Sequence, residues 1–198
     1  MLGTFHDEPV LLIKTAMGNR SLAYDFRPPS SGRNDPNGEF ESAEYKLTIQ
    51  GVRDTLAKID QVVPGYKGQG FEIAGFGWHQ GWNDRVTPAF AAEYEVNMAR
   101  FIRDVRSAVG VPAMPFVIGT TGMDGNPDYS EVELAQLQME NFTAYPDFNG
   151  NVAVVDTQSF WFPVSQGLFA KARPLRAVDG VSFEIRQGET LEIGRAHV

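Results

Sequence analysis

The sequence predicts an α/β fold in which a parallel sheet is covered by helices on both faces. Short apolar runs of strand length alternate along the chain with segments whose apolar residues recur every three or four positions. The resulting order is strand, helix, strand, helix, strand, helix, strand, and such alternation is typical of parallel sheets. Ligands of these sheets bind beyond the carboxyl ends of the strands, so we look for chemistry there.

The first half of the chain supplies two expected strands and one helix. Residues 10–16 form a compact apolar run before Gly18, and we expect a buried strand there. Residues 25–40 are rich in Pro, Gly, Ser and Asn, which predicts a long loop. An apolar stripe over residues 45–59 predicts an amphipathic helix. Residues 71–78 predict a second buried strand.

The second half repeats the alternation. Residues 87–110 predict a helix that a Thr-Pro pair opens and a glycine ends. A short strand is expected over residues 116–119. The third helix, over residues 130–145, begins with a Ser-x-x-Glu capping box. A fourth strand follows over residues 152–156.

Composition limits the classes of partner. The net charge is -8 and the pI is about 4.9. We therefore expect no nucleic acid and no membrane as a partner, because both reward basic patches. The chain has no cysteine, which excludes disulfides and thiolate metal sites. The first eight residues lack an export signal, so either the protein is cytoplasmic or its true N-terminus is missing; the motifs favour the second.

The segment richest in chemistry is Trp78-His79-Gln80-Gly81-Trp82-Asn83-Asp84, which follows an expected strand. Esterases need hydrogen-bond donors aimed at the oxygen that becomes negative in the tetrahedral intermediate. A side-chain amide at the end of a rigid strand is such a donor, and Asn83 is the candidate. The structural alternative is a turn in which the Asn83 side chain caps its own backbone.

The second segment, residues 15–22, follows the first expected strand. Gly18 allows backbone N–H groups to approach a ligand closely, which makes it a candidate second donor; it is equally suited to a simple turn. Asn19 and Arg20 are candidate substrate contacts, although Arg20 is also suited to pinning the loop. Ser21 lacks the strained elbow of G-x-S-x-G and is not expected to be a nucleophile.

These motifs resemble those of one enzyme family. Residues 10–16, 18–22 and 25–29 are similar to the second sequence block of the sialate O-acetylesterase-like (SASA) group of SGNH hydrolases, and residues 78–84 to the third. The resemblance covers about residues 7–160. It implies a three-layer α/β/α sandwich with a parallel, flavodoxin-like sheet, incomplete at both ends in this chain.

The resemblance also implies an activity. Members of the family resemble esterases that remove acetyl groups from sugars through Ser, His and Asp, without a metal or another cofactor. By resemblance, Asn83 and the backbone of Gly18 form the oxyanion hole, and the intact protein is exported to the periplasm or the medium. We interpret the two tryptophans of the third block as core and pocket lining, its histidine as a wall residue and its aspartate as a residue that orients the loop. The candidate substrate contacts of this block are Trp78, His79, Gln80, Gly81, Trp82 and Asp84.

Two departures from the family pattern predict that this chain is inactive. The nucleophile of the family lies in a Gly-x-Ser block upstream of Val10, and residues 1–9 contain none. The family's histidine follows the last strand, where this chain has only His197. We expect the core of a serine-type carbohydrate O-acetylesterase, whose partner is a small-molecule or polysaccharide acetyl ester. A carbohydrate-binding domain without chemistry is the alternative.

The C-terminal part resembles a different family. Residues 161–191 are similar to the first strands of an oligopeptide ABC transporter ATP-binding protein, but no G-x-x-x-x-G-K-[ST] follows, so we expect no ATP binding. One choice of codons for residues 192–198 resembles a sequencing-adapter read. We therefore expect a metagenomic chimera: a partial esterase domain over residues 1–160, truncated ATPase strands and an adapter-derived tail. A transporter ATP-binding fragment is the third functional alternative.

Overall fold

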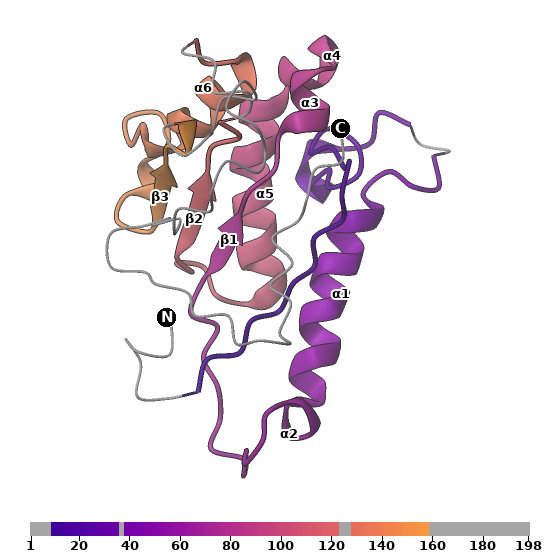
Figure 1. Cartoon of the computed structure of the whole chain (residues 1–198), viewed down its shortest axis with the longest axis vertical. Coiled ribbons are helices and arrows are strands. Elements are labelled where there is room, and N and C mark those ends of the chain that lie inside the picture. The colour runs from indigo at the N-terminus through magenta and orange to yellow at the C-terminus, as the bar shows by residue number, and fades with distance from the viewer. Residues whose placement is uncertain (1–8, 36–37, 123–127, 159–198) are drawn as a thin grey trace, which may run out of the picture.

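The computed structural model of the protein describes residues 9–35, 38–122 and 128–158. Within them, β1 (Phe76–Trp78), β2 (Phe116–Gly119) and β3 (Val152–Val155) form a sheet in the order β1-β2-β3 (Figure 1). Both strand pairs are parallel. The expected α/β fold with a parallel sheet is therefore confirmed.

The helices interleave with the strands along the chain, as the sequence predicts. They are α1 (Ala43–Ala57), α2 (Ile59–Val62), α3 (Trp82–Arg85), α4 (Pro88–Ala91), α5 (Tyr94–Val109) and α6 (Glu131–Leu137). The 3-10 turns are η2 (Pro29–Ser31), η4 (Gln138–Glu140) and η5 (Pro146–Phe148). Over the described ranges, no helix has both the length and the hydropathy needed to cross a bilayer.

The expected helix over residues 87–110 is divided. α4 ends at Ala91 and α5 begins at Tyr94, with two residues between them. α5 ends at Val109 and is capped by Gly110, whose φ of 75° lies in the left-handed region that glycine adopts without strain. The break follows Pro88 by four residues, and the apolar stripe of the sequence continues across it, which is why the stripe alone predicts one helix.

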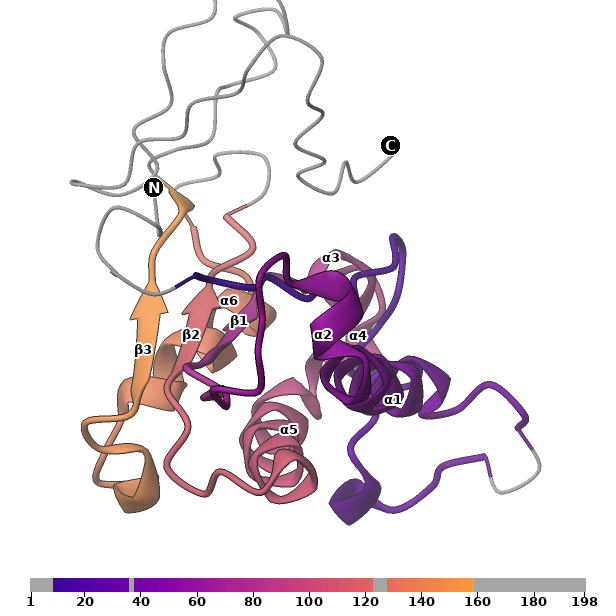
Figure 2. The same ribbon diagram turned by 90° about the horizontal axis from the view of Figure 1, so that it is seen from below.

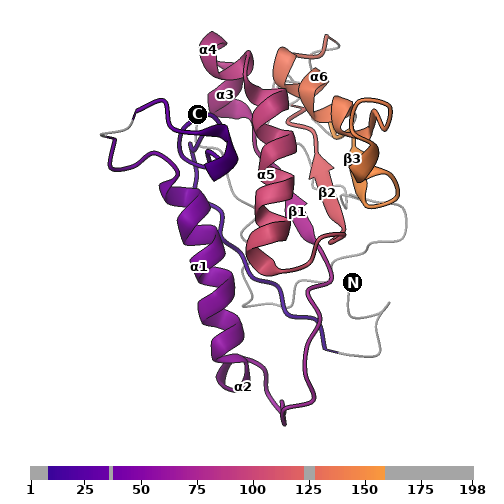
Figure 3. The same cartoon turned by 180° about the vertical axis from the view of Figure 1, so that it is seen from behind.

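α5 is the main helix packed on the sheet. It lies behind β1 and β2 in Figure 1 and in front of them in Figure 3. Its Phe101 is fully buried, with ring centroids 4.6 Å from Trp78 and 5.9 Å from Phe76. α1 joins the same core through Tyr45, whose ring lies 5.9 Å from Phe101. Burying a side chain of this size contributes about 1.5–3 kcal/mol.

The opposite face of the sheet is uncovered in the part of the chain that the structure describes. Gly77, Val117 and Ala153 are aligned by the register and all are exposed. Val117 retains 44% of its accessible surface. Figure 2 shows α1 and α5 together on the other side of the three strands. The described helices therefore cover one of the two faces that the sequence predicts to be covered.

The prediction of a buried strand over residues 10–16 is wrong. These residues are extended but belong to no sheet, and Leu12 is 75% exposed. They run between β1 and α1 in Figures 1 and 3. A strand needs a neighbour to accept and donate its backbone hydrogen bonds, and no described segment lies in register beside this one. For a similar reason, the strand expected over residues 71–78 is reduced to β1.

Candidate active site

Two loops meet at the carboxyl end of β1. Asn83 is the second residue of α3, and its Nδ2 donates to the main-chain oxygen of Asn19 at 3.4 Å. Asn19 follows Gly18 directly and has a φ of 57° in the left-handed region, which Asn tolerates better than most residues. The structure thus brings together the two segments that carry the predicted oxyanion donors.

Asp84 holds the loop around residues 18–23 against the segment that follows β1. Its two carboxylate oxygens accept the backbone N–H groups of Leu22 and Ala23, each at 2.9 Å. The carboxyl group is fully buried, and this burial raises its pKa above the ordinary value, although the N–H donors around it oppose the shift. The sequence interpretation that Asp84 orients the loop agrees with these contacts.

Gln80 adds a second link between the same loops. Its Nε2 donates to the main-chain oxygen of Arg20 at 2.8 Å and to Asp84 Oδ2 at 2.6 Å. Both amide hydrogens are therefore engaged within the protein. The Gln80 side chain therefore supports the loop, and its contact with substrate stays a prediction.

A buried polar network lies beneath Gln80. Gln136 of α6 and Tyr94 of α5 are both fully buried. Gln136 Nε2 donates to the Gln80 main-chain oxygen at 2.7 Å, and the Tyr94 hydroxyl donates to the same oxygen at 3.0 Å. Trp78 Nε1 donates to the Tyr94 hydroxyl at 3.1 Å. Sequence reasoning missed both Gln136 and the role of the Tyr94 hydroxyl, since a lone glutamine beside an apolar stripe carries no sequence signal.

The two glycines of the candidate site differ in their surroundings. Gly18 is exposed, and a Cβ added there would have nothing within 4 Å. Gly81 is buried, and a Cβ there would overlap Thr121 Cγ2 and lie 2.9 Å from Val132 Cγ1. Gly18 is thus open to a ligand, whereas Gly81 is required by the close approach of α6 and the segment after β2.

The N-terminal loop is pinned by ion pairs and hydrogen bonds. Arg20 lies 3.1 Å from Asp25 and 3.2 Å from Glu44, so it serves the loop as the sequence suggested. The Ser21 hydroxyl is fully buried and donates to Asp25 Oδ2 at 2.9 Å. A hydroxyl held in this way is unsuited to nucleophilic attack, in agreement with the sequence reasoning. Arg27 is also buried and donates to Glu93 at 2.9 Å.

The aromatic residues of the block occupy different environments. Trp78 belongs to the core, where it contacts Phe26 edge-on at 5.3 Å between centroids. Trp82 is half-buried and lies beneath the guanidinium of Arg85, 5.2 Å from the ring centroid. His79 is exposed, and its Nδ1 lies 3.3 Å from the main-chain oxygen of Gly119 at the end of β2. His79 thus borders the carboxyl edge of the sheet.

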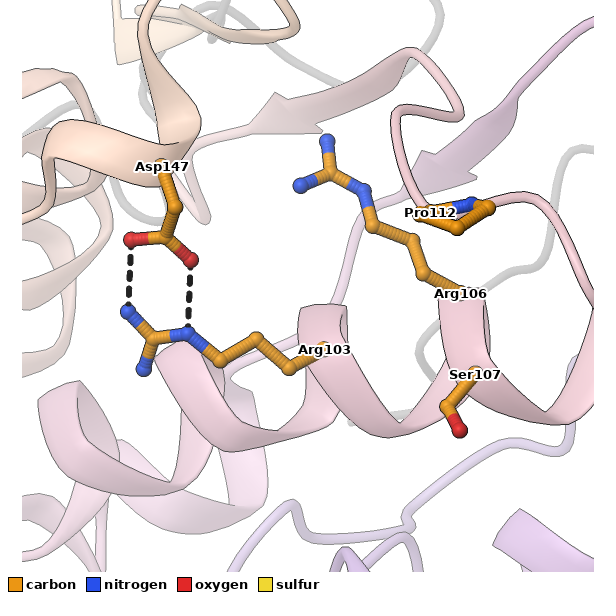
Figure 4. Close-up of a pocket in the computed structure, with 5 residues that line it drawn as sticks. All are labelled: Arg103, Arg106, Ser107, Pro112 and Asp147. Carbon is orange, nitrogen blue, oxygen red and sulfur yellow. Dashed lines mark hydrogen bonds and ion pairs between the residues drawn. The ribbon is translucent and has the colours of Figure 1, made fainter.

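A pocket lies at the opposite, amino edge of the sheet (Figure 4). Arg103 forms a two-point ion pair with Asp147 there, with both N–O distances at 2.8 Å. Arg106 donates to the main-chain oxygens of Met114 and Asn151 ahead of β2 and β3. The guanidinium groups of Arg103 and Arg106 are thus bound by protein oxygens and connect α5 to the segments around the sheet. The pocket is therefore a poor candidate for catalysis. Across the described ranges, no cluster of three or more His, Asp or Glu side chains is placed to hold a metal.

The fold and the site define an α/β protein whose polar loops converge at the carboxyl edge of a parallel sheet. The family model described as "Carbohydrate esterase, sialic acid-specific acetylesterase" (SASA) matches residues 1–161. The chain belongs to this family, and the match supports a carbohydrate esterase-like domain.

Two further similarities cover less of the chain. A segment of 33 residues, 17% of the chain, is 48% identical to the "Dipeptide transport ATP-binding protein DppF" of Haemophilus influenzae and spans 10% of that protein. This match supports the resemblance to an ATP-binding protein. A solved protein structure from Arabidopsis thaliana is 22% identical with a TM-score of 0.45, covering 63% of this chain and 44% of that one. The expectations for residues 161–198 lie outside the described residues.

Proposed function

We propose that the domain is the core of a serine-type, SGNH-like esterase that removes acetyl groups from sugars. The observation that carries the proposal is the contact between Asn83 and Asn19, which brings the exposed Gly18 loop to the amide at the end of β1. In the proposed mechanism, a serine attacks the acetyl carbonyl and a histidine transfers the proton. The Gly18 backbone N–H and Asn83 Nδ2 then stabilise the oxyanion, and removing one such donor typically lowers turnover about 100- to 1000-fold.

The Asn83 side chain is suited to this role by its surroundings. It is half-buried at the start of a short helix, while its neighbour Asp84 is fully buried and fixed by backbone N–H groups. A donor on such a fixed support needs little reorganisation when charge develops on a substrate oxygen. The present partner of Asn83 Nδ2 is the Asn19 oxygen at 3.4 Å, a long hydrogen bond that a carbonyl or oxyanion ligand can replace.

Recognition of the acetyl group is the first test. Titrating the protein with an O-acetylated xylo-oligosaccharide should shift the NMR signals of Gly18 and of the Asn83 side chain, and the deacetylated sugar should not. Asn83→Ala should abolish the response, whereas Asn149→Ala, in an exposed turn before β3, should retain it. Equal binding of both sugars would instead support a carbohydrate-binding domain without chemistry.

We also propose that the 198-residue chain has no esterase turnover of its own. Residues 1–9 contain no Gly-x-Ser, and no histidine lies between residues 80 and 196. Hydrolysis of 4-nitrophenyl acetate by the purified chain should therefore not exceed the rate in buffer. Turnover that Asn83→Ala abolishes would contradict this proposal while supporting the oxyanion assignment.

We propose that residues 161–191 have a chimeric origin and no nucleotide-binding function; the similarity of a 33-residue segment to a transporter ATPase supports the first part. The sequence contains no G-x-x-x-x-G-K-[ST], the loop whose backbone cradles phosphates. Calorimetry with ATP and Mg²⁺ should accordingly detect no binding. Measurable ATP binding would revive the transporter alternative.

A further inference from the structure

We propose that Gln136 and Tyr94 are positioning residues, which set the place of Asn83 by jointly holding the main-chain oxygen of Gln80. This inference rests on the proposed function, because Asn83 is the group being positioned for an oxyanion. Neither side chain belongs to the two loops that carry the candidate donors: Gln136 lies on α6 and Tyr94 on α5.

The first step of the argument is the fixed Gln80 carbonyl. It accepts from Gln136 Nε2 at 2.7 Å and from the Tyr94 hydroxyl at 3.0 Å. Two donors occupy both lone-pair directions of a carbonyl oxygen, so the peptide plane that joins Gln80 to Gly81 cannot rotate without breaking them.

The second step runs from this peptide to Asn83. Gly81 follows it, and its main-chain oxygen accepts the N–H of Arg85 at 2.9 Å, which forms the single turn of α3. Asn83 lies in the middle of that turn. A rotation of the Gln80 peptide would therefore tilt α3 and move the Asn83 amide away from the Asn19 loop.

The third step is the link to the next strand. Gln136 Oε1 accepts the backbone N–H of Thr121 at 3.0 Å, just after β2, while its Nε2 serves Gln80 after β1. One side-chain amide thus ties together the segments that follow two adjacent strands. Thr121 and Gly81 are also closely packed, so the two segments leave no room for a side chain between them.

The burial and pairing of these polar groups indicate that the network fixes the geometry of the site rather than merely filling the core. Gln136 and the Tyr94 hydroxyl are fully buried, where unpaired polar groups are costly and an apolar side chain would suffice for packing. The hydroxyl also lies 3.1 Å from Gln80 Oε1, so its single hydrogen is shared between the two Gln80 oxygens, and burial raises the pKa of the hydroxyl, which keeps it a donor. Buried polar networks that are fully paired restrict a site to one geometry.

The test uses Gln136→Glu, which keeps the size of the side chain but donates only when protonated. Burial raises the pKa of the introduced carboxyl, so it should be protonated in mild acid and ionised at higher pH. In acid, the Asn83 side-chain NMR signals should resemble those of the wild type. As the pH rises, they should shift, and the Arg85 amide, which closes the turn of α3, should exchange at least about five-fold faster, because the ionised carboxylate cannot donate to the Gln80 oxygen.

Controls separate positioning from general loss of stability. Gln138→Glu makes the same charge change at an exposed position two residues further on and should show no such pH dependence. Asp84, whose carboxylate is bonded to Gln80, also titrates. Its effect on the Asn83 signals is measured in wild-type spectra at the same pH values and subtracted from the shifts in the variant. Amides of Phe101 and Ile118 in the core should remain unchanged.

Tyr94→Phe is a second variant that retains the buried ring and removes only the hydroxyl. It should shift the Asn83 side-chain signals at every pH. Unchanged Asn83 signals in both variants would overturn the positioning proposal. Shifted Asn83 signals in a protein that does not respond to acetylated sugar would support positioning but contradict the proposed function, so the two failures are distinguishable.

Discussion

The side-chain amide of Asn83 lies 3.4 Å from the main-chain oxygen of Asn19, although the two residues are 64 positions apart in the sequence. Residues 9–17, which precede Asn19, belong to no strand, so no sheet hydrogen bonds hold them in place. The contact therefore depends on side chains, principally Asp84 and Gln80, which bind the backbone of Arg20, Leu22 and Ala23.

Replacing Asp84 should release this loop. Asp84→Asn retains the shape but offers one acceptor oxygen, so either Leu22 or Ala23 must lose its partner and face an NH₂ group. We expect a loss of about 1–3 kcal/mol in the free energy of unfolding, measured by urea denaturation, with faster exchange of both amides. Asp60→Asn, on the exposed face of α2, serves as the control and should change stability by less than about 0.5 kcal/mol. Unaltered exchange in Asp84→Asn would show that the loop is held by packing alone.

The pKa values of two carboxyl groups should depart in opposite directions from the ordinary value of 3.8. Burial raises the pKa of Asp84, whereas the hydrogen bonds from Arg103 lower the pKa of Asp147. As the pH falls, Asp84 should take up its proton before Asp147 does, at a pH above 3.8. The folded protein binds this proton more tightly than the unfolded chain, so the free energy of unfolding should rise as Asp84 is protonated.

The stabilising effect of Asp147 has the opposite sign. It is fully present above pH 3.8 and is lost as the pH falls through the lowered pKa of the folded state. Carboxyl-carbon NMR across this range can follow both groups. An Asp84 midpoint at or below that of Asp147 would contradict the assignment of burial as the dominant effect on Asp84.

Gly81 should tolerate no side chain. A Cβ there would overlap Thr121 and press on Val132, so we expect Gly81→Ala to cost at least about 1–3 kcal/mol, as overpacking usually does. Gly77→Ala is a matched control, because nothing lies within 4 Å of a Cβ at that position. Thermal unfolding should therefore show a lower midpoint for the first variant and little change for the second. Equal midpoints would indicate that α6 can move away from Gly81 without penalty.

The capping box of α6 should contribute measurably to stability. The Ser130 hydroxyl accepts the N–H of Glu133, and the Glu133 carboxylate accepts the N–H of Ser130 at 2.8 Å. Ser130→Ala should cost about 1 kcal/mol, while Ser107→Ala, at an exposed position within α5, should be neutral or slightly stabilising. Chemical denaturation can compare the two. A neutral Ser130→Ala would mean that tertiary packing of α6 replaces the cap.

Features that depend on neighbours in the sequence could be predicted. The capping box, the αL glycine that ends α5 and the stripe that includes Phe101 are all local patterns, and the structure confirms them. The parallel sheet followed from the alternation of strands and helices, which topology restricts to few arrangements.

Features that depend on distant partners could not be predicted. The apolar run at residues 10–16 has the composition of a strand, but a strand exists only when another backbone pairs with it. Gln136 meets Gln80 across 56 residues, and nothing in the pattern around either glutamine indicates their contact. The positions of Asn83 and Gly18 after expected strands and the motif resemblance both indicate an oxyanion role, which remains a prediction for each of them.

The sheet face at Gly77, Val117 and Ala153, which no described segment covers, has a consequence for solubility. It spans all three strands of the described sheet, whose edge strands are β1 and β3, and open edges beside apolar surface favour association between copies. The charge of -8 opposes such encounters through mutual repulsion. Because salt shortens the reach of that repulsion to about 8 Å at physiological ionic strength, solubility should decline as salt is added.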